Sequence, residues 1–334
     1  MELLERFPCE VKGKRTNNVS VPPKKMMIRL LFLASFSVLF GTSLLADESV
    51  KKSWEALSDT KFSKGFVLSG PLHASPTRNA TFGQKDEKPE WRIAQWDSKG
   101  LLDRVLIDDD TVKLTDDYKS VTLNRKTGAI NLAMDTLREY ESPRTSPHQP
   151  WACLLLDQMS FQKPIKVSEA AEIWVEADFE LTENKAHGPQ NPDLHTAQLV
   201  WVFYMKNTNR ESKGYRDFLW FCLQLFDSRY DFAPDFAMQD FNPQGAQGNG
   251  HFIRLLGSKR YFDKPVVVGE RQTLRYDIRD AVQEAIEVAH KHGFIVNTTI
   301  DDVILDGTNI GWEVPGTYDV GATLYKMSVQ VMDR

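Results

Sequence analysis

The stretch Tyr215–Phe236 reads YRDFLWFCLQLFDSRYDFAPDF and combines an apolar run with a polar tip. The run Phe218–Phe226 is almost continuously apolar, so neither face of a strand built from it suits water. Charged and aromatic residues follow at once in positions 227–231. This pattern predicts a buried strand in the middle of a sheet that leads into a loop, where binding residues commonly lie.

The rest of the chain predicts many short strands around this one. Leu199–Met205 is also apolar on both faces, whereas Ala171–Leu181 alternates apolar and polar residues, as in a strand with one solvated face. The stretch Asp277–His292 has apolar residues at helical spacing and is followed by Gly293, a typical helix end. Short strands separated by turn residues are typical of sandwiches and barrels. We therefore predict a mainly β fold, a two-sheet antiparallel β-sandwich of jelly-roll or concanavalin-like type with one packed α-helix.

Composition and charge restrict the partners. The 334 residues carry a formal net charge of −5 and show no basic stripe, which argues against a nucleic-acid partner. Cys153 and Cys222 lie in apolar runs, where small buried thiols are common, and a disulfide between them is the alternative in an exported chain. No Cys/His spacing resembles a zinc site, and the aspartate runs 108–110 and 116–117 lack the calcium-loop pattern. We expect no metal and no cofactor.

The N-terminal part of the chain predicts export. Basic residues precede the apolar run Leu30–Leu45, which ends among small residues, as in a secretory signal peptide. We expect 1–25 to be a misannotated upstream extension, 26–46 the signal peptide, 47–61 a flexible lead-in and 62–334 a single β-sandwich domain. The mature protein is then secreted, periplasmic or held in the cell envelope, without a further membrane span. A retained signal anchor is the alternative, because the apolar run approaches spanning length.

The alternating strand carries Glu176, Asp178 and Glu180 on its polar face. This E-x-D-x-E row resembles the catalytic strand of the laminarinase-like retaining glycosidases, a jelly-roll family. The resemblance implies that Glu176 is the nucleophile, Glu180 the acid/base and Asp178 the residue that orients them. The chain departs from the family by lacking the Gly and Trp-Pro context before the motif. The alternative interpretation is the solvated face of a strand near a sheet edge.

A second set of residues suits a polysaccharide lyase. Leu137–Tyr140 (LREY) and Ala197–Leu199 (AQL) resemble short motifs of the alginate-lyase jelly roll. A lyase needs a cationic or amide group at the uronate carboxylate and a Tyr or His base for the neighbouring proton. These residue types are supplied by Arg138, Gln198, His195 and Tyr230. The alternatives are structural: a surface pair for Arg138, a loop donor for His195 and a strand-end amide for Gln198.

A third set lies on predicted loops and suits sugar binding, because hydroxyls need polar partners and a sugar ring needs a flat apolar surface. It consists of Asp227, Arg229, Tyr230, Trp312 and Glu313. The alternatives are again structural: Asp227 and Arg229 tie a loop together, while Trp312 plugs the core and Glu313 anchors a turn. The segments 216–221, 225–230 and 309–320 also resemble a group of exported bacterial β-sandwich proteins of unassigned function.

The resulting hypothesis is an exported β-sandwich that recognises a polysaccharide or other glycan. One alternative is a carbohydrate-active enzyme, either a polysaccharide lyase or a retaining glycoside hydrolase. Another is a structural envelope protein without catalysis. An enzyme requires its candidate groups to meet in one cleft, whereas a binding protein needs aligned aromatic and polar side chains.

Overall fold

The apolar run of the first stretch forms β13 (Phe218–Asp227), which lies inside a ten-stranded sheet between β12 (Gln198–Asn207) and β15 (Phe252–Leu256). The structure is a computed structural model that describes residues 52–71, 77–82, 87–140, 142–240 and 251–334. Every side chain from Phe221 to Leu225 is buried, although neighbours in a strand point to opposite faces. The predicted strand with two covered faces is confirmed.

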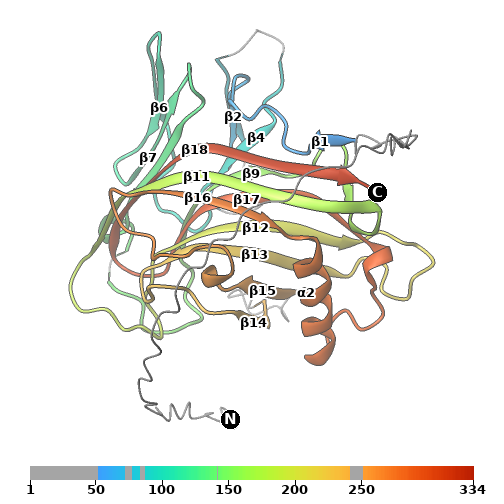
Figure 1. The fold of residues 1–334 in the computed structure, drawn as a ribbon. Helices are drawn as coiled ribbons and strands as arrows, with labels where there is room; N and C mark the ends of the chain where they lie inside the picture. The colour runs from blue at the N-terminus through green and yellow to red at the C-terminus, as the bar shows by residue number, and fades with distance from the viewer. Residues whose placement is uncertain (1–51, 72–76, 83–86, 141, 241–250) are drawn as a thin grey trace, which may run out of the picture. The chain divides into compact units, whose positions relative to one another are not determined.

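The ten-stranded sheet has the order β14-β15-β13-β12-β17-β9-β4-β2-β3, and β10 also pairs with β17 (Figure 1). Its neighbours run antiparallel, except that β13 is parallel to β15 and β2 is parallel to β4. The remaining strands are β2 (Phe66–Leu68), β3 (Arg78–Ala80), β4 (Trp91–Ala94), β9 (Ala152–Gln158), β10 (Ile165–Lys166), β14 (Phe236–Gln239) and β17 (Val303–Val314).

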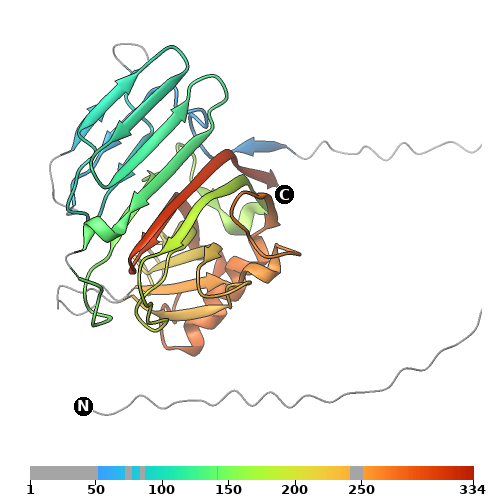
Figure 2. The ribbon, with the colours of Figure 1, turned by 90° about the vertical axis from the view of Figure 1, so that its left-hand side faces the viewer.

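An eight-stranded sheet forms the second layer, in the order β16-β11-β18-β8-β7-β6-β5, with β1 pairing with β18. Figure 2 shows that the cyan and green strands β5–β8 continue this sheet beyond the long red strand β18. Its strands are β1 (Ser53–Glu55), β5 (Arg104–Ile107), β6 (Thr111–Thr115), β7 (Lys119–Asn124), β8 (Ile130–Asp135), β11 (Ala170–Ala186), β16 (Arg271–Asp277) and β18 (Tyr318–Asp333).

The two sheets pack face to face around one large hydrophobic core. Inward side chains of β11, such as Val175 and Phe179, meet those of β12, such as Trp201 and Phe203. The buried Trp201 indole satisfies its N–H by donating to Thr308 Oγ1 over 2.8 Å. The predicted two-sheet antiparallel β-sandwich is therefore confirmed, and so is the alternation predicted for residues 171–181.

The predicted helix is α2 (Arg279–Lys291), and it packs against β11 of one sheet and β15 of the other (Figure 1). Its buried stripe holds Val282, Ala285 and Ile286, which follow helical spacing. Asp277 precedes the helix and accepts a hydrogen bond from the Arg279 backbone N–H over 3.1 Å. The shorter helices are α1 (Thr136–Glu139) and the 3-10 turns Val167–Glu169, Ser258–Arg260 and Ile300–Asp302.

Two consecutive strands occupy the middle of the two layers. β17 lies between β12 and β9 in the ten-stranded sheet, and β18 lies between β11 and β8 in the eight-stranded sheet. The chain crosses from one layer to the other through the short turn 315–317. Because β17 and β18 are the last two strands, all of their other strand partners come earlier in the chain.

One expectation about a segment needs correction. The described part of the expected flexible lead-in, residues 52–61, is built into the sandwich, because β1 pairs with β18 and Leu57 is buried. Residues 266–268, which have the composition of a strand, form none, although they lie close to the eight-stranded sheet, where Gly269 N–H donates to the Leu181 carbonyl. The expected upstream extension and signal peptide, 1–46, lie outside the described residues. Among the described residues, no helix is long and apolar enough to cross a membrane.

Candidate functional site

Glu176 lies on the outward face of the eight-stranded sheet, at the middle of β11. Lys326 on β18 donates to its carboxylate over 2.5 Å, and Arg275 on β16 donates over 3.1 Å. The hydrogen bond from Lys326 is the main reason that the pKa of Glu176 falls below its ordinary value. Glu176 is therefore a charged partner in a cross-strand ion-pair row.

The other two carboxylates of the E-x-D-x-E row have partners of the same kind. Arg271 pairs with Asp178, and the Tyr325 hydroxyl donates to Glu180 over 3.0 Å. Neither of the two pockets described below is lined by these carboxylates. The arrangement matches the solvated strand face that the sequence offered as the alternative, and the catalytic roles stay a prediction.

The lyase residues Arg138 and His195 are both engaged with backbone carbonyl groups. Arg138, on α1, donates to the carbonyl oxygen of Asp117. His195 is buried, its Nδ1 accepts the Asn191 backbone N–H over 3.0 Å, and its Nε2 lies 2.8 Å from the Arg144 carbonyl oxygen. Because both ring nitrogens hold the loop, His195 matches the loop role offered as its alternative.

Asp227 is the polar anchor at the end of β13. Its carboxylate accepts hydrogen bonds from Thr196 Oγ1 and Gln198 Nε2, each over 2.8 Å, and from the Arg229 guanidinium over 2.6 Å. Burial raises the pKa of Asp227, but the hydrogen bonds from Arg229 outweigh it, so the net pKa lies below its ordinary value. The structure thus brings Gln198, Asp227 and Arg229 together from two of the predicted sets.

A pocket of about 370 Å³ lies beside this anchor. Tyr230 is 46% exposed at the pocket, and the Arg229 guanidinium lies over one face of its ring. Asn184 contributes a buried Oδ1 atom that has no hydrogen-bond partner. The pocket is lined by Asn184, Phe226, Ser228, Arg229, Tyr230, Asp231, Pro265, Val266, Val267 and Val268.

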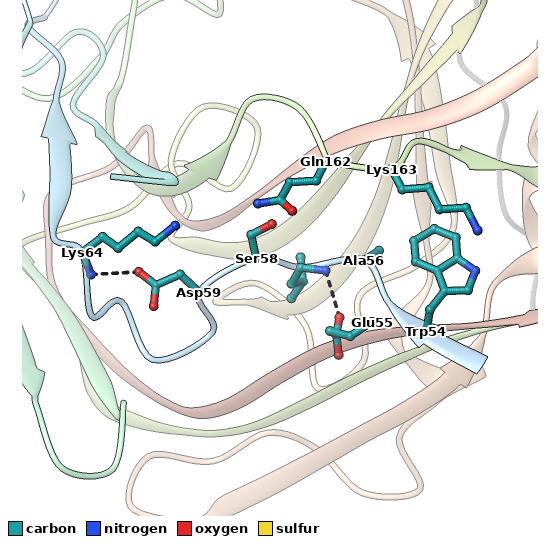
Figure 3. A pocket seen from close by; sticks show the side chains of 9 residues that line it. Trp54, Glu55, Ala56, Ser58, Asp59, Lys64, Gln162 and Lys163 are labelled. Atoms are coloured by element: carbon teal, nitrogen blue, oxygen red, sulfur yellow. Dashed lines mark hydrogen bonds between the residues drawn. The ribbon is translucent and has the colours of Figure 1, made fainter. Parts of the chain in front are cut away.

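A second pocket, of about 400 Å³, lies where β1 joins the sandwich (Figure 3). Lys163 Nζ lies 4.0 Å from the centre of the Trp54 ring at one end of this pocket. The Glu55 carboxylate accepts hydrogen bonds from the Leu57 and Val329 backbone N–H groups over 2.9 and 2.8 Å. Its polar groups therefore serve mainly to fasten β1 to the sheet.

The outward face of the ten-stranded sheet differs from both pockets, because it is lined mainly by apolar and aromatic side chains. One cluster on this face comprises Val200, Val202, Tyr204, Cys222, Phe218, Trp220, Ile253 and Leu255. A second comprises Ala94, Cys153, Leu155, Trp96 and Trp151. Trp96, Trp151 and Trp220 keep part of their surface exposed. Cys153 and Cys222 are free thiols within these clusters, as the sequence favoured.

A polar row crosses three strands at one end of this face. Strand register places Gln198 beside Asp227 on one side and beside Glu313 on the other. The same register places Glu313 beside Cys153. Paired residues of neighbouring strands share a face, so Gln198, Asp227 and Glu313 point the same way although they belong to different predicted sets.

Glu313 is a carboxyl group whose pKa lies above its ordinary value. Burial raises its pKa, a hydrogen bond with Trp151 lowers it, and the charge of Asp240 raises it, with a net upward shift. Asp240 in turn accepts a hydrogen bond from Trp220 Nε1 over 3.1 Å. The Glu313 carboxyl group therefore holds its proton to a higher pH than usual, and it lies within hydrogen-bond reach of Trp151.

A buried polar network lies further along the same face. The Tyr204 hydroxyl donates to Asp157 over 3.0 Å and accepts from Asn309 Nδ2 over 2.9 Å, and Arg92 pairs with Asp157. Asn309 Oδ1 and Gln224 Oε1 are buried acceptors without a hydrogen-bond partner. Buried acceptors of this kind are costly unless a donor reaches them.

The sugar-binding role predicted for Trp312 needs correction. Its side chain is fully buried, its Nε1 donates to the Leu132 carbonyl over 3.1 Å, and its ring packs against Phe226. The expected platform for a sugar ring is therefore wrong for Trp312, because an indole between the sheets presents no free face. Its neighbour Glu313 points outward, since successive strand residues alternate.

Several residues of this face were missed at the sequence level, although a signal existed. Gln224 interrupts the apolar run of β13, and Asp157 interrupts that of β9. A polar residue within a strand that is apolar on both faces must be paired or functional, because an unpaired buried polar group is costly. Which strands lie side by side, and so which of these residues meet, is not readable from the runs alone.

No family model matches the chain, and no curated protein matches it. Solved structures do match at low identity. An endoglucanase from Rhodothermus marinus is 10% identical with a TM-score of 0.38, covering 67% of this chain and 93% of its own. A family 11 xylanase from Neocallimastix patriciarum is 9% identical with a TM-score of 0.38, covering 70% and 98%. A family 12 xyloglucanase from Bacillus licheniformis is 10% identical with a TM-score of 0.39, covering 68% and 97%.

Proposed function

We propose that this protein binds a glycan chain along the outward face of the ten-stranded sheet. The observation that carries the proposal is the set of three partly exposed tryptophans, Trp96, Trp151 and Trp220, on a sheet face that also carries Glu313 and Gln198. The signal expected at 26–46 would place the protein outside the cytoplasm, so the glycan we propose is extracellular or part of the envelope.

The chemistry of this face suits a sugar chain. A pyranose ring presents C–H groups that pack on an indole face, and its hydroxyls need donors and acceptors placed beside that face. Gln198 and Glu313, which are paired on neighbouring strands, add an amide and a carboxyl group at one end of the face. Arg92 and Lys206, two cationic side chains on the described part of this face, are already paired with Asp157 and Asp306. This pairing favours a neutral polysaccharide over a uronate polymer.

Binding to an array of neutral and acidic polysaccharides tests this proposal. We expect the protein to retain neutral glycans, and Trp151→Ala to weaken the binding about tenfold or more through the lost ring contact. Tyr230→Ala, at the pocket beside Asp227, is the matched aromatic control, and it should bind like the parent. Loss of binding in Tyr230→Ala with no change in Trp151→Ala would move the site to that pocket and contradict the proposal.

Hydrolysis of the bound glycan is a second candidate function, and the raised pKa of Glu313 is the observation that favours it. A protonated carboxyl group can donate its proton to the leaving oxygen of a glycosidic bond, while a water molecule bonds to the anomeric carbon and releases a proton. Release of new reducing ends by the parent, abolished in Glu313→Gln with glycan binding retained, is the expected result for an enzyme. Binding without release supports recognition alone, and neither binding nor release from a folded sample leaves the structural envelope protein.

A further inference from the structure

Three side chains that the proposed glycan site does not use converge at one end of the sandwich. Asp135 ends β8, Asp319 lies at the start of β18, and the two residues are directly paired across the strands. His187 follows the end of β11, whose last residue, Ala186, pairs with Tyr318. One ligand atom from each of these three residues lies within 4.8 Å of the other two.

The cluster brings two carboxylates together on neighbouring strands. Two carboxylates directly opposite each other on neighbouring strands repel, and such pairs are destabilising without a cation. The Asp135 Oδ1 atom is buried and has no hydrogen-bond partner. His187 Nε2 lies 2.8 Å from Asp319 Oδ1, and Lys185 Nζ lies 3.5 Å from Asp319 Oδ2. Both of these groups reach Asp319, whereas Asp135 Oδ1 has neither as a partner.

The backbone around the cluster is held in place. His187 N–H donates to the Thr317 carbonyl over 2.9 Å, and Thr317 Oγ1 donates back to the His187 carbonyl over 2.9 Å. Asp135 N–H donates to the Tyr118 carbonyl over 2.7 Å. Ligands on rigid elements keep their geometry before an ion arrives, which favours binding.

We propose that Asp135, His187 and Asp319 bind a divalent transition-metal ion of the zinc class. Imidazole nitrogen and carboxylate oxygen are both ligands that zinc-class ions accept, whereas calcium and magnesium prefer oxygen ligands alone. Ligand atoms about 2.1 Å from one ion stand up to about 4.2 Å apart, so small side-chain rotations close the cluster onto it. The His187 and Asp319 side chains each keep 21% of their surface exposed, which leaves a path from solvent.

Lys185 allows a variant that should strengthen metal binding instead of weakening it. Its Nζ lies 3.5 Å from Asp319 Oδ2, on a side chain that is 66% exposed, so it competes with an ion for that carboxylate. Removing its charge should strengthen metal binding at this cluster. An adventitious surface site elsewhere would not respond to this residue.

Zinc binding by the full chain, after treatment with a chelator, tests the proposal by equilibrium dialysis with metal analysis and by calorimetry. We expect Zn²⁺ to bind with Ca²⁺ much weaker, His187→Ala and Asp319→Asn each to weaken binding more than about tenfold, and Lys185→Gln to tighten it severalfold. Matched controls are His148→Ala and Asp109→Asn, which lie outside the cluster and should bind like the parent. Thermal melts without metal show whether each variant is folded.

Three results would overturn the proposal. One is the absence of zinc binding by the folded parent, and another is unchanged affinity in the folded His187→Ala variant. The third is a preference for Ca²⁺ over Zn²⁺, which would contradict the metal class. Because the readout is metal content and affinity, the outcome does not depend on whether the protein binds a glycan.

Discussion

The two outward faces of the sandwich differ in how they accommodate carboxylate groups. On the eight-stranded sheet, Glu176 and Asp178 form ion pairs with cationic side chains of neighbouring strands, and these side chains are partly exposed to water. On the ten-stranded sheet, tryptophans and aliphatic side chains cover the face, and Asp157 is buried among them. An outward face that is apolar and aromatic is commonly a binding surface. The glycan site that we propose uses the apolar face, whereas the charged face keeps the other layer in contact with water.

The largest difference between the faces should be in the cost of losing one aspartate. Asp157→Asn leaves Arg92 without its buried counter-charge, and we expect a loss of about 3 kcal/mol in the free energy of unfolding. Asp178→Asn breaks the pair with Arg271, whose side chain is 56% exposed, and should cost less than about 1 kcal/mol. Urea unfolding of both variants measures the two values. Equal losses would mean that Asp157 is as well solvated as Asp178.

The next contrast concerns two tryptophans. Trp220→Ala removes an aromatic ring from the ten-stranded face, and we expect about tenfold weaker glycan binding, the equivalent of about 1.4 kcal/mol. Trp174→Ala removes a ring on the eight-stranded face, where Arg275 lies 3.8 Å from the ring centre, and should leave binding unchanged. Calorimetric titration with the best glycan from the array separates the two variants. A weaker Trp174→Ala would show that the ligand uses the other face.

The smallest expected effects have opposite signs and come from two glutamates. The pKa of Glu313 is raised by burial, so its stabilising contribution is complete below its ordinary value of 4.5 and is lost as the pH rises through its folded pKa. Glu313→Gln should therefore be more stable than the parent at neutral pH and equal to it in acid.

The pKa of Glu176 is lowered, mainly by its hydrogen bond with Lys326, so its contribution is present above 4.5 and is lost as the pH falls through its folded pKa. Glu176→Gln should be less stable than the parent at neutral pH, with the difference fading in acid. Thermal melts across this pH range measure both pairs. The same sign in both variants would contradict the distinction between the faces.

Local patterns were enough to predict much of the fold. Residue spacing identified three strands. Ala171–Leu181 alternates because one face of the strand is buried, and β12 and β13 are almost continuously apolar because both of their faces are buried. The helix predicted at 277–292 is α2, Arg279–Lys291, for the same reason.

The candidate site was only partly predictable. Glu313, Gln198 and Asp227 were each singled out by type, but their meeting depends on the register of β12 with both of its neighbours. Asp135, His187 and Asp319 show the same limit, because long-range strand pairing has no counterpart in local spacing. Trp312 was misplaced because a tryptophan next to a turn has the same local pattern whether its ring faces the core or the solvent.

The position of β17 and β18 in the two layers has a consequence for how the protein folds. Without β17, the ten-stranded sheet falls into two separate halves, and without β18 the eight-stranded sheet does the same. Both halves of each layer are complete in the chain before residue 303 is reached. Contacts between distant segments form slowly because long loops must close first. We therefore expect folding to wait for one late event, the joint insertion of two adjacent strands, with exposed strand edges in the chain until it occurs.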